Sequence, residues 1–181
     1  LPLPTAKKFS LKKLQSPCLI EEKVDGWRMI IWKQHAYGRK MDSLGRWINK
    51  WDKLPDHIQK KATDFPIDGE VFWPGKDSAA VSTGLKERSA ELQFVDFRIA
   101  DLEMLPNQHL ISVQHAGIQI PRLFSLGYQD HLTLNTEFLK KVAKDMNIEG
   151  WVLKEESVIP TWWKLKLEET YDLIVTGLKW A

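Results

Sequence analysis

Residues 18–32 read CLIEEKVDGWRMIIW, with an apolar run on each side of Asp25-Gly26. Apolar runs that flank Asp-Gly predict two short strands with a tight turn between them. Because side chains alternate along a strand, Glu21, Lys23 and Asp25 are expected on one face. Three ionisable groups on one face are costly in a core and useful in a pocket, so this stretch predicts a site.

The rest of the sequence predicts an α+β fold with largely antiparallel sheets flanked by helices. Helical spacing of apolar residues predicts helices at 52–63 and at 135–146, the second after the cap residue Asn135. Residues 78–88 are small and polar and predict a loop. Further strand-like runs occupy residues 68–73, 92–99, 150–154, 162–167 and 172–176.

Composition indicates one soluble domain spanning 1–181. The chain has 26 basic and 24 acidic residues and a formal charge of +2, so any basic surface must be local. The single cysteine, Cys18, excludes an intramolecular disulfide and favours a reducing, intracellular compartment. No apolar run approaches the roughly 20 residues of a membrane span, and no membrane contact is expected.

Lys23, a candidate nucleophile, and Arg28, a candidate phosphate-binding residue, lie within six residues of each other. A lysine amine attacks phosphorus only when neutral, a form that nearby cations and partial burial favour. The planar fork of Arg28 suits phosphate or ribose oxygens. An ordinary hairpin with a surface salt bridge would show the same local pattern, so this motif alone does not establish a site.

Carboxylates stand at the start of two predicted strands. Asp68-Gly69-Glu70 precedes Val-Phe-Trp, and Glu149-Gly150 precedes Trp-Val-Leu-Lys. Glu70 and Glu149 are candidate ligands for Mg²⁺, which prefers carboxylate oxygens, retained waters and nucleotide phosphates. Each acid alone is also compatible with a solvated strand edge.

Two lysines share one face of the predicted strand at 162–167. Lys164 and Lys166 are two residues apart, and Trp163 and Leu165 occupy the opposite face. Two cations side by side repel each other unless an anion lies between them, and a nucleotide α-phosphate would supply it. An exposed basic face is the alternative.

In this order, the motifs resemble those of the covalent nucleotidyltransferase superfamily, which contains ATP-dependent DNA ligases, RNA ligases and mRNA capping enzymes. They read Lys-x-Asp-Gly-x-Arg, Asp-Gly-Glu, Glu-Gly-x-Val-x-Lys and Trp-Lys-x-Lys, and the resemblance covers about residues 19–180. It implies an ATP-grasp-like nucleotidyltransferase (adenylation) domain.

The resemblance implies roles for individual residues. Lys23 would carry AMP in a phosphoramidate bond, with Lys164 and Lys166 at the α-phosphate as the other catalytic residues. Glu70 would contact the ribose or position the metal, and Glu149 would support the metal. The remaining nucleotide-binding residues are Glu21 at the adenine amino group, Arg28 and Arg39 at the sugar or phosphate, and Phe97 stacked on the base.

Two of these assignments leave alternatives open. Arg39 lies in Tyr-Gly-Arg-Lys, where Lys40 and Arg46 are nearby competitors. Phe94 competes with Phe97 because this chain departs from the commoner Phe-Asp order, and either phenylalanine is compatible with a core position.

Among relatives, the sequence looks most like short viral or phage DNA ligases. The resemblance implies a monomer that uses ATP and Mg²⁺ to seal nicked double-stranded DNA in repair, replication or recombination. It also implies a cytoplasmic location, in the host if the source is viral, and an OB-fold domain after residue 181. The alternatives are an RNA ligase and a non-catalytic module that binds nucleotide or nucleic acid.

Overall fold

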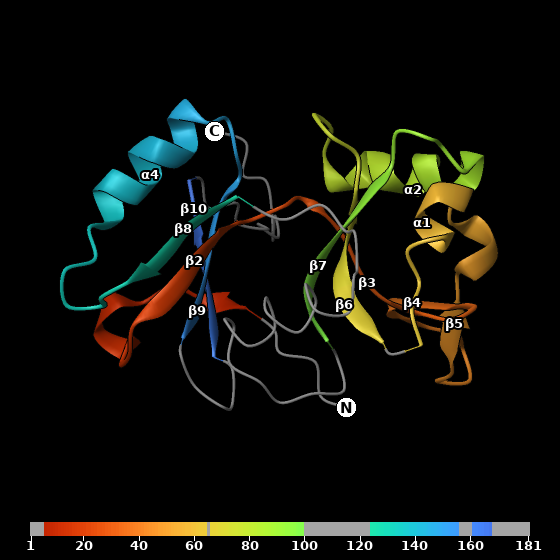
Figure 1. The fold of residues 1–181 in the computed structure, drawn as a ribbon, viewed down its shortest axis with the longest axis horizontal. Coiled ribbons are helices and arrows are strands. Elements are labelled where there is room, and N and C mark those ends of the chain that lie inside the picture. The colour runs from red at the N-terminus through yellow and green to blue at the C-terminus, as the bar shows by residue number, and fades with distance from the viewer. Residues whose placement is uncertain (1–5, 65, 100–123, 156–160, 168–181) are drawn as a thin grey trace, which may run out of the picture.

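The computed structural model of the chain describes residues 6–64, 66–99, 124–155 and 161–167, and for residues 96–99 it describes the backbone alone. Two five-stranded sheets face each other, with helices on their outer sides (Figure 1). Sheet A has the strand order β1-β10-β9-β2-β8, and sheet B has the order β5-β4-β3-β6-β7. Among the described strands only β1 and β10 pair in parallel. The predicted α+β class is confirmed.

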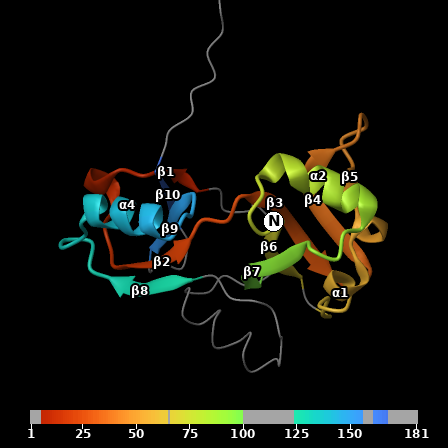
Figure 2. The ribbon, with the colours of Figure 1, turned by 90° about the horizontal axis from the view of Figure 1, so that it is seen from above.

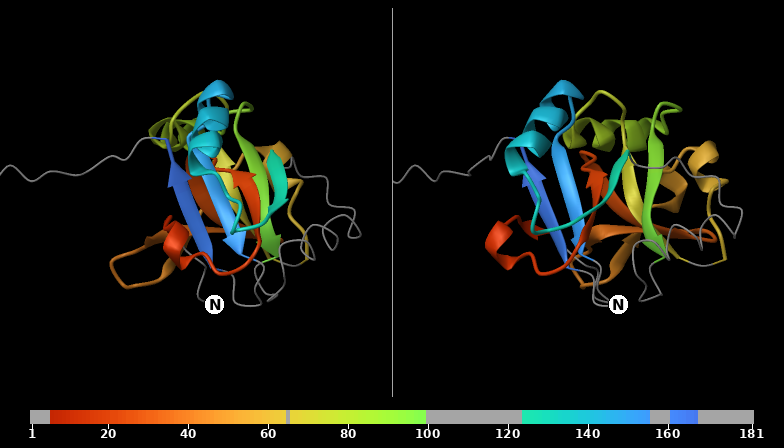
Figure 3. Two further views of the ribbon diagram at one scale, coloured as in Figure 1. Left: turned by 90° about the vertical axis from the view of Figure 1, so that its left-hand side faces the viewer. Right: turned by 60° about the vertical axis from the view of Figure 1, so that its left-hand side comes forward.

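Sheet A packs its outer face on helix α4 (Thr136–Asp145), which lies across the strands in Figure 3. A 3-10 turn, η1 (Leu11–Lys13), lies between β1 and β2. The buried side chains on this face include Ile20, Trp151 and Trp163. The strands of sheet A are β1 (Lys7–Lys8), β2 (Cys18–Glu22), β8 (Ser125–Gln129), β9 (Gly150–Glu155) and β10 (Trp162–Lys166).

Sheet B packs its outer face on helices α1 (Asp56–Gln59) and α2 (Ser78–Glu87). Met29, Val71 and Phe94 are among the buried residues of this second core. The 3-10 turn η2 (Trp51–Lys53) precedes α1. The strands of sheet B are β3 (Gly26–Trp32), β4 (His35–Met41), β5 (Trp47–Asn49), β6 (Ile67–Phe72) and β7 (Gln93–Ile99).

The loop predicted at residues 78–88 is wrong, because α2 fills most of it. Oδ1 of Asp77 caps the helix by accepting a hydrogen bond from the backbone N–H of Ala80 at 3.0 Å. Val81 and Leu85 are buried against sheet B, one turn apart. The remaining positions are small or polar, so the apolar stripe of the helix is narrow. A stripe this narrow gives too weak a periodic signal to predict a helix from the sequence.

The helix predicted at 52–63 is also shorter than expected, because it begins only after Pro55, a residue that favours the first turn of a helix over its interior. The helix predicted at 135–146 is confirmed, and Oδ1 of Asn135 caps it by accepting from the N–H of Phe138 at 3.0 Å. No described helix is long and apolar enough to cross a membrane. The strand predicted at 172–176 lies outside the described residues.

The predicted turn at Asp25-Gly26 is instead a crossing between sheets, because β2 belongs to sheet A and β3 to sheet B (Figure 2). Gly26 is the first residue of β3 and pairs with Phe72 of β6. A Cβ at Gly26 would lie 2.4 Å from the carbonyl oxygen of Val71. Glycine is therefore needed here for close packing of two backbones and not for a turn.

Candidate active site

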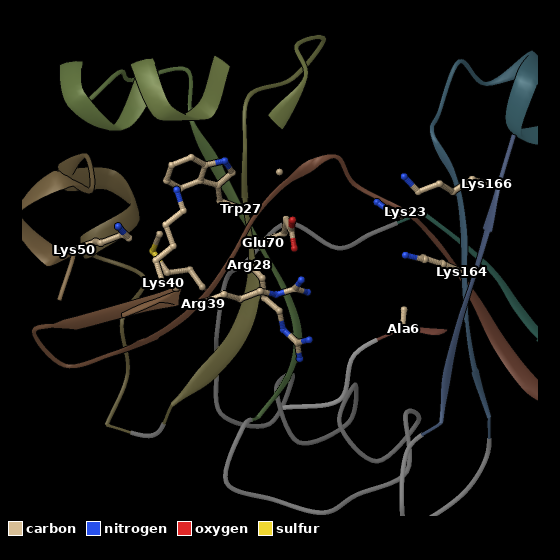
Figure 4. Close-up of a pocket in the computed structure, with 13 residues that line it drawn as sticks. Ala6, Lys23, Trp27, Arg28, Arg39, Lys40, Lys50, Glu70, Lys164 and Lys166 are labelled. Carbon is tan, nitrogen blue, oxygen red and sulfur yellow. The ribbon is translucent and has the colours of Figure 1, made fainter. Parts of the chain in front are cut away.

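A cavity of about 400 Å³ opens between the two sheets, next to the crossing from β2 to β3 (Figure 4). Its volume lies in the range of about 300–1,000 Å³ that is usual for small-molecule sites. The excess of cations in one hollow suits a polyanionic ligand. Among the described residues, the ionisable ones that line the cavity are one acid, Glu70, and the cations Lys23, Arg28, Arg39, Lys40, Lys50, Lys164 and Lys166.

Lys23 follows the last residue of β2 and projects into this cavity. Its backbone N–H donates to the carbonyl oxygen of Gly150 at 2.9 Å, which extends the sheet A pairing by one residue. Its Nζ donates to Oε2 of Glu149. The side chains of Lys23 and Glu149 are 20% and 23% exposed, so the amine is oriented yet accessible from the cavity.

Glu149 also contacts one of the two lysines of β10. Its Oε1 lies 2.6 Å from Nζ of Lys166, and Lys164 lines the cavity beside them. Trp163 and Leu165 point into the core of sheet A, as strand alternation predicts. One carboxylate therefore holds the amine of Lys23 and one ammonium group of the lysine pair at the same place.

Arg28 lines the same cavity but is only 8% exposed. Its Nε and Nη2 donate to the two carboxylate oxygens of Asp68, at 2.8 and 2.5 Å. Its guanidinium carbon lies 5.4 Å from the ring centroid of Trp162, on the opposite sheet. Arg28 therefore joins the two sheets at the cavity wall.

Glu70 lies in β6 opposite Arg28 of β3. Burial raises the pKa of Glu70 to about 7, while the positive charges of Lys23, Arg28 and Arg39 oppose that rise. The negative charge of Asp68 adds to it. Near neutral pH Glu70 is therefore divided between the acid, which donates a hydrogen bond, and the carboxylate, which accepts one.

A smaller cavity of about 110 Å³ adjoins the first and contains Glu21. The carboxylate of Glu21 is buried and forms an ion pair with Nζ of Lys154, outside regular hydrogen-bond geometry. Nζ of Lys154 also lies 4.7 Å from the ring centroid of Trp162. The predicted contact of Glu21 with adenine stays a prediction, and in this structure the carboxylate faces a cation that the sequence did not reveal as its partner.

Arg39 of β4 lines both cavities, Lys40 lines only the larger, and Arg46 lines neither. Phe94, the alternative stacking residue, is 1% exposed in the core of sheet B. Phe97 lies in β7, and its side chain is outside the described part of the chain.

Carboxylates in the described ranges form no cluster of three or more metal-ligating side chains. Glu149 contacts Nζ of Lys23, and the charge of Lys23 also acts on Glu70, so both acids face the same amine. Two carboxylates with waters and nucleotide phosphates are an ordinary ligand set for Mg²⁺, and the donor chemistry fits that ion.

Three residues were not singled out from the sequence as site residues: Lys154 and Trp162, which line the smaller cavity, and Asp68, which contacts Arg28. Asp68 and Lys154 stand inside quoted motifs. Alternation along β6 places Asp68 on the face of Glu70, whereas the register of β9 with β2 places Lys154 on the face of Glu21. Trp162 precedes Lys164 by two residues on the same face, so the same signal was available for it.

No protein-family model and no curated protein matches the sequence. Solved structures match in fold. A structure from a study of Lig E DNA ligases superposes with a TM-score of 0.70 at 15% identity, covering 91% of this chain and 68% of that chain. The Chlorella virus DNA ligase-adenylate has a TM-score of 0.65 at 15% identity, with the same coverages. An archaeal ATP-dependent RNA ligase has a TM-score of 0.59 at 16% identity, covering 91% of this chain and 48% of that chain.

The chain has the fold of a ligase adenylation domain. The fold that the motif order predicted is therefore confirmed. Both DNA and RNA ligases share it, and at these identities the likeness concerns the fold alone. The chain spans 68% of the length of the Lig E structure and about half that of several other matches.

Proposed function

We propose that this chain is the catalytic domain of an ATP-dependent DNA ligase that seals nicks in double-stranded DNA through an AMP adduct on Lys23. The observation that carries the proposal is the contact of Nζ of Lys23 with Glu149, whose other oxygen contacts Lys166. A nucleophile, a proton acceptor and a cation thus meet beside a cavity that Lys23 and Lys166 line and that is rich in positive charge.

In the first step the amine of Lys23 attacks the α-phosphorus of ATP. The P–N bond forms, the bond between the α-phosphorus and the bridging oxygen breaks, and pyrophosphate leaves with the electron pair. Glu149 is placed to take the proton that the amine loses. Lys164 and Lys166 offset the negative charge that develops on the α-phosphate.

In the second step an oxygen of the DNA 5′-phosphate attacks the phosphorus of AMP, the P–N bond breaks, and Lys23 recovers its proton. In the third step the 3′-hydroxyl oxygen attacks the phosphorus of the 5′-phosphate, its proton is released to solvent, the bond from that phosphorus to AMP breaks, and AMP leaves. Positioning and positive charge supply most of the acceleration in displacements of this kind. Bound Mg²⁺, held by Glu70 and Glu149, would supply further positive charge at the phosphates.

The test is covalent labelling with α-labelled ATP and Mg²⁺, read on a denaturing gel and by mass spectrometry. We expect label on the wild type and on Lys141→Ala, an exposed control on α4, and none on Lys23→Ala. Equal labelling of the three proteins contradicts the role of Lys23. Binding of ATP without any adduct, on the full-length protein, supports a non-catalytic module instead.

RNA sealing is the second candidate, and the likeness to an archaeal ATP-dependent RNA ligase favours it. Matched nicked duplexes, one entirely of DNA and one with RNA on both sides of the nick, separate the two candidates. Faster sealing of the DNA nick is expected. A preference for the RNA nick contradicts the DNA assignment and leaves the labelling chemistry intact.

A further inference from the structure

Three residues at the sheet B end of the larger cavity have no part in the proposed steps. Nζ of Lys40 and Nζ of Lys50 each lie 5.8 Å from the ring centroid of Trp27. Both distances are within the roughly 6 Å of a cation–π contact. Two ammonium groups therefore share one indole ring, opposite the lysines of β10 in Figure 4.

Within the part of the chain that the structure describes, these two cations have no acidic partner. Among the described residues, neither Lys40 nor Lys50 forms an ion pair. Burial, followed by the charges of Lys53 and Lys40, lowers the pKa of Lys50. Lys50 is half-buried and Lys40 is exposed. Like charges beside the same ring repel each other, and an anion between them offsets that cost.

The pair is continuous with the catalytic end of the cavity. Arg39 lies between Lys40 and the centre of the cavity, and Arg28 lies next to it (Figure 4). Gly38 lies next to the side chain of Lys50. A Cβ at position 38 would be in van der Waals contact with Cε of Lys50, at 3.6 Å. A row of cations thus leads toward Lys23, which suits a ligand with one negative charge per repeating unit.

We propose that Lys40 and Lys50, seated over Trp27, bind the phosphodiester backbone of the polynucleotide strand whose 5′-phosphate end reaches Lys23. This inference rests on the proposed function, since it assigns a substrate subsite to the same cavity. The triphosphate of ATP is the other possible phosphate source. It is disfavoured because Lys23, Lys164 and Lys166 already surround the opposite end of the cavity.

The experiment measures binding of a fluorescent nicked DNA duplex by anisotropy, in EDTA and at several salt concentrations, for wild type and Lys40→Ala/Lys50→Ala. Each phosphate contact contributes a slope of about 0.9 to the fall of log affinity with log salt. Between about 50 and 200 mM salt, wild type should therefore lose about tenfold more affinity than the double variant. Lys60→Ala/Lys86→Ala removes two exposed lysines outside the cavity and should keep the wild-type slope.

Equal slopes for wild type and Lys40→Ala/Lys50→Ala overturn the inference. So does a double variant that loses AMP labelling as strongly as DNA binding, because the pair would then hold the ATP phosphates. Labelling of the wild type in the same samples keeps the two hypotheses apart. A changed slope without any adduct on the wild type supports the subsite and contradicts the ligase chemistry, whereas an unchanged slope with an adduct does the reverse.

Discussion

Arg28 and Asp68, on neighbouring strands of sheet B, form a buried ion pair with two hydrogen bonds, and their side chains are 6% and 0% exposed. Removing Asp68 takes away the carboxylate that accepts both hydrogen bonds from Arg28 and leaves the buried guanidinium without it. We predict that Asp68→Ala lowers the free energy of unfolding by about 3–5 kcal/mol, measured by urea denaturation.

The matched control for that prediction is Lys140→Ala, since the side chains of Lys140 and its partner Glu137 are 42% and 81% exposed. Exposed pairs contribute little, and no measurable change is expected. Should Asp68→Ala not fold, Asp68→Asn, which keeps one acceptor oxygen, gives a graded loss. Midpoints for Asp68→Asn that match those of Lys140→Ala would contradict the prediction.

Glu70 should make stability depend on pH in the direction opposite to most carboxylates. Its pKa rises from 4.5 to about 7 in the folded protein, so between these values the folded state binds a proton that the unfolded state has released. Stability is therefore lost as pH rises through this window. The contribution is at most about 3 kcal/mol, at 1.36 kcal/mol per pH unit.

We expect urea denaturation at pH 5 and pH 8 to show this loss in wild type and in the exposed control Glu87→Gln. Glu70→Gln, which cannot ionise, should lack it. If wild type and Glu70→Gln lose the same stability between pH 5 and pH 8, Glu70 is charged in the folded protein throughout that pH range.

Gly26→Ala should destabilise the protein through backbone crowding. The new Cβ would approach the carbonyl oxygen of Val71, at a distance of 2.4 Å before any adjustment. Overpacking of this kind costs about 1–3 kcal/mol. The control is Gly38→Ala, whose Cβ would meet the carbonyl oxygen of Arg28 at an ordinary 3.5 Å. Thermal unfolding that ranks Gly38→Ala as the less stable of the two would contradict the prediction.

Glu149→Gln should slow AMP labelling of Lys23 by about two orders of magnitude, the lower range for loss of a general base. The amide keeps the size of the side chain but cannot take a proton from the amine. The measurement is the labelling rate at saturating ATP, with the exposed Glu137→Gln as the control. A rate within twofold of wild type would remove Glu149 from the proton transfer.

Sequence patterns predicted the architecture well where one residue type carried a strong local signal. Asn135 caps α4 as expected, and the strand with Lys164 and Lys166 has its predicted faces. The prediction at Asp25-Gly26 was wrong because a turn and a crossing between sheets share the same local residues. A turn and a crossing are distinguished only by strand pairing, and here β2 pairs with β9 whereas β3 pairs with β6.

The partners of the candidate site residues were harder to predict than the strand faces on which these residues lie. Glu21 pairs with Lys154, and Arg28 with Asp68, through contacts between strands that are distant in sequence. Alternation places each side chain on a face, but strand register decides which charges meet, and no local pattern encodes that register.

The crossing segment is anchored at both of its ends. Lys23 is bound through its backbone N–H to Gly150 of sheet A, and Oδ2 of Asp25 accepts from the backbone N–H of Ser78, at the start of α2 on sheet B, at 3.1 Å. Two residues of extended chain span only about 7 Å, so these anchor points cannot separate far. If the cavity opens, we expect sheet B to turn about this short segment. Lys23, which contacts Gly150 and Glu149, would then keep its place beside sheet A while Lys40 and Lys50 move with sheet B.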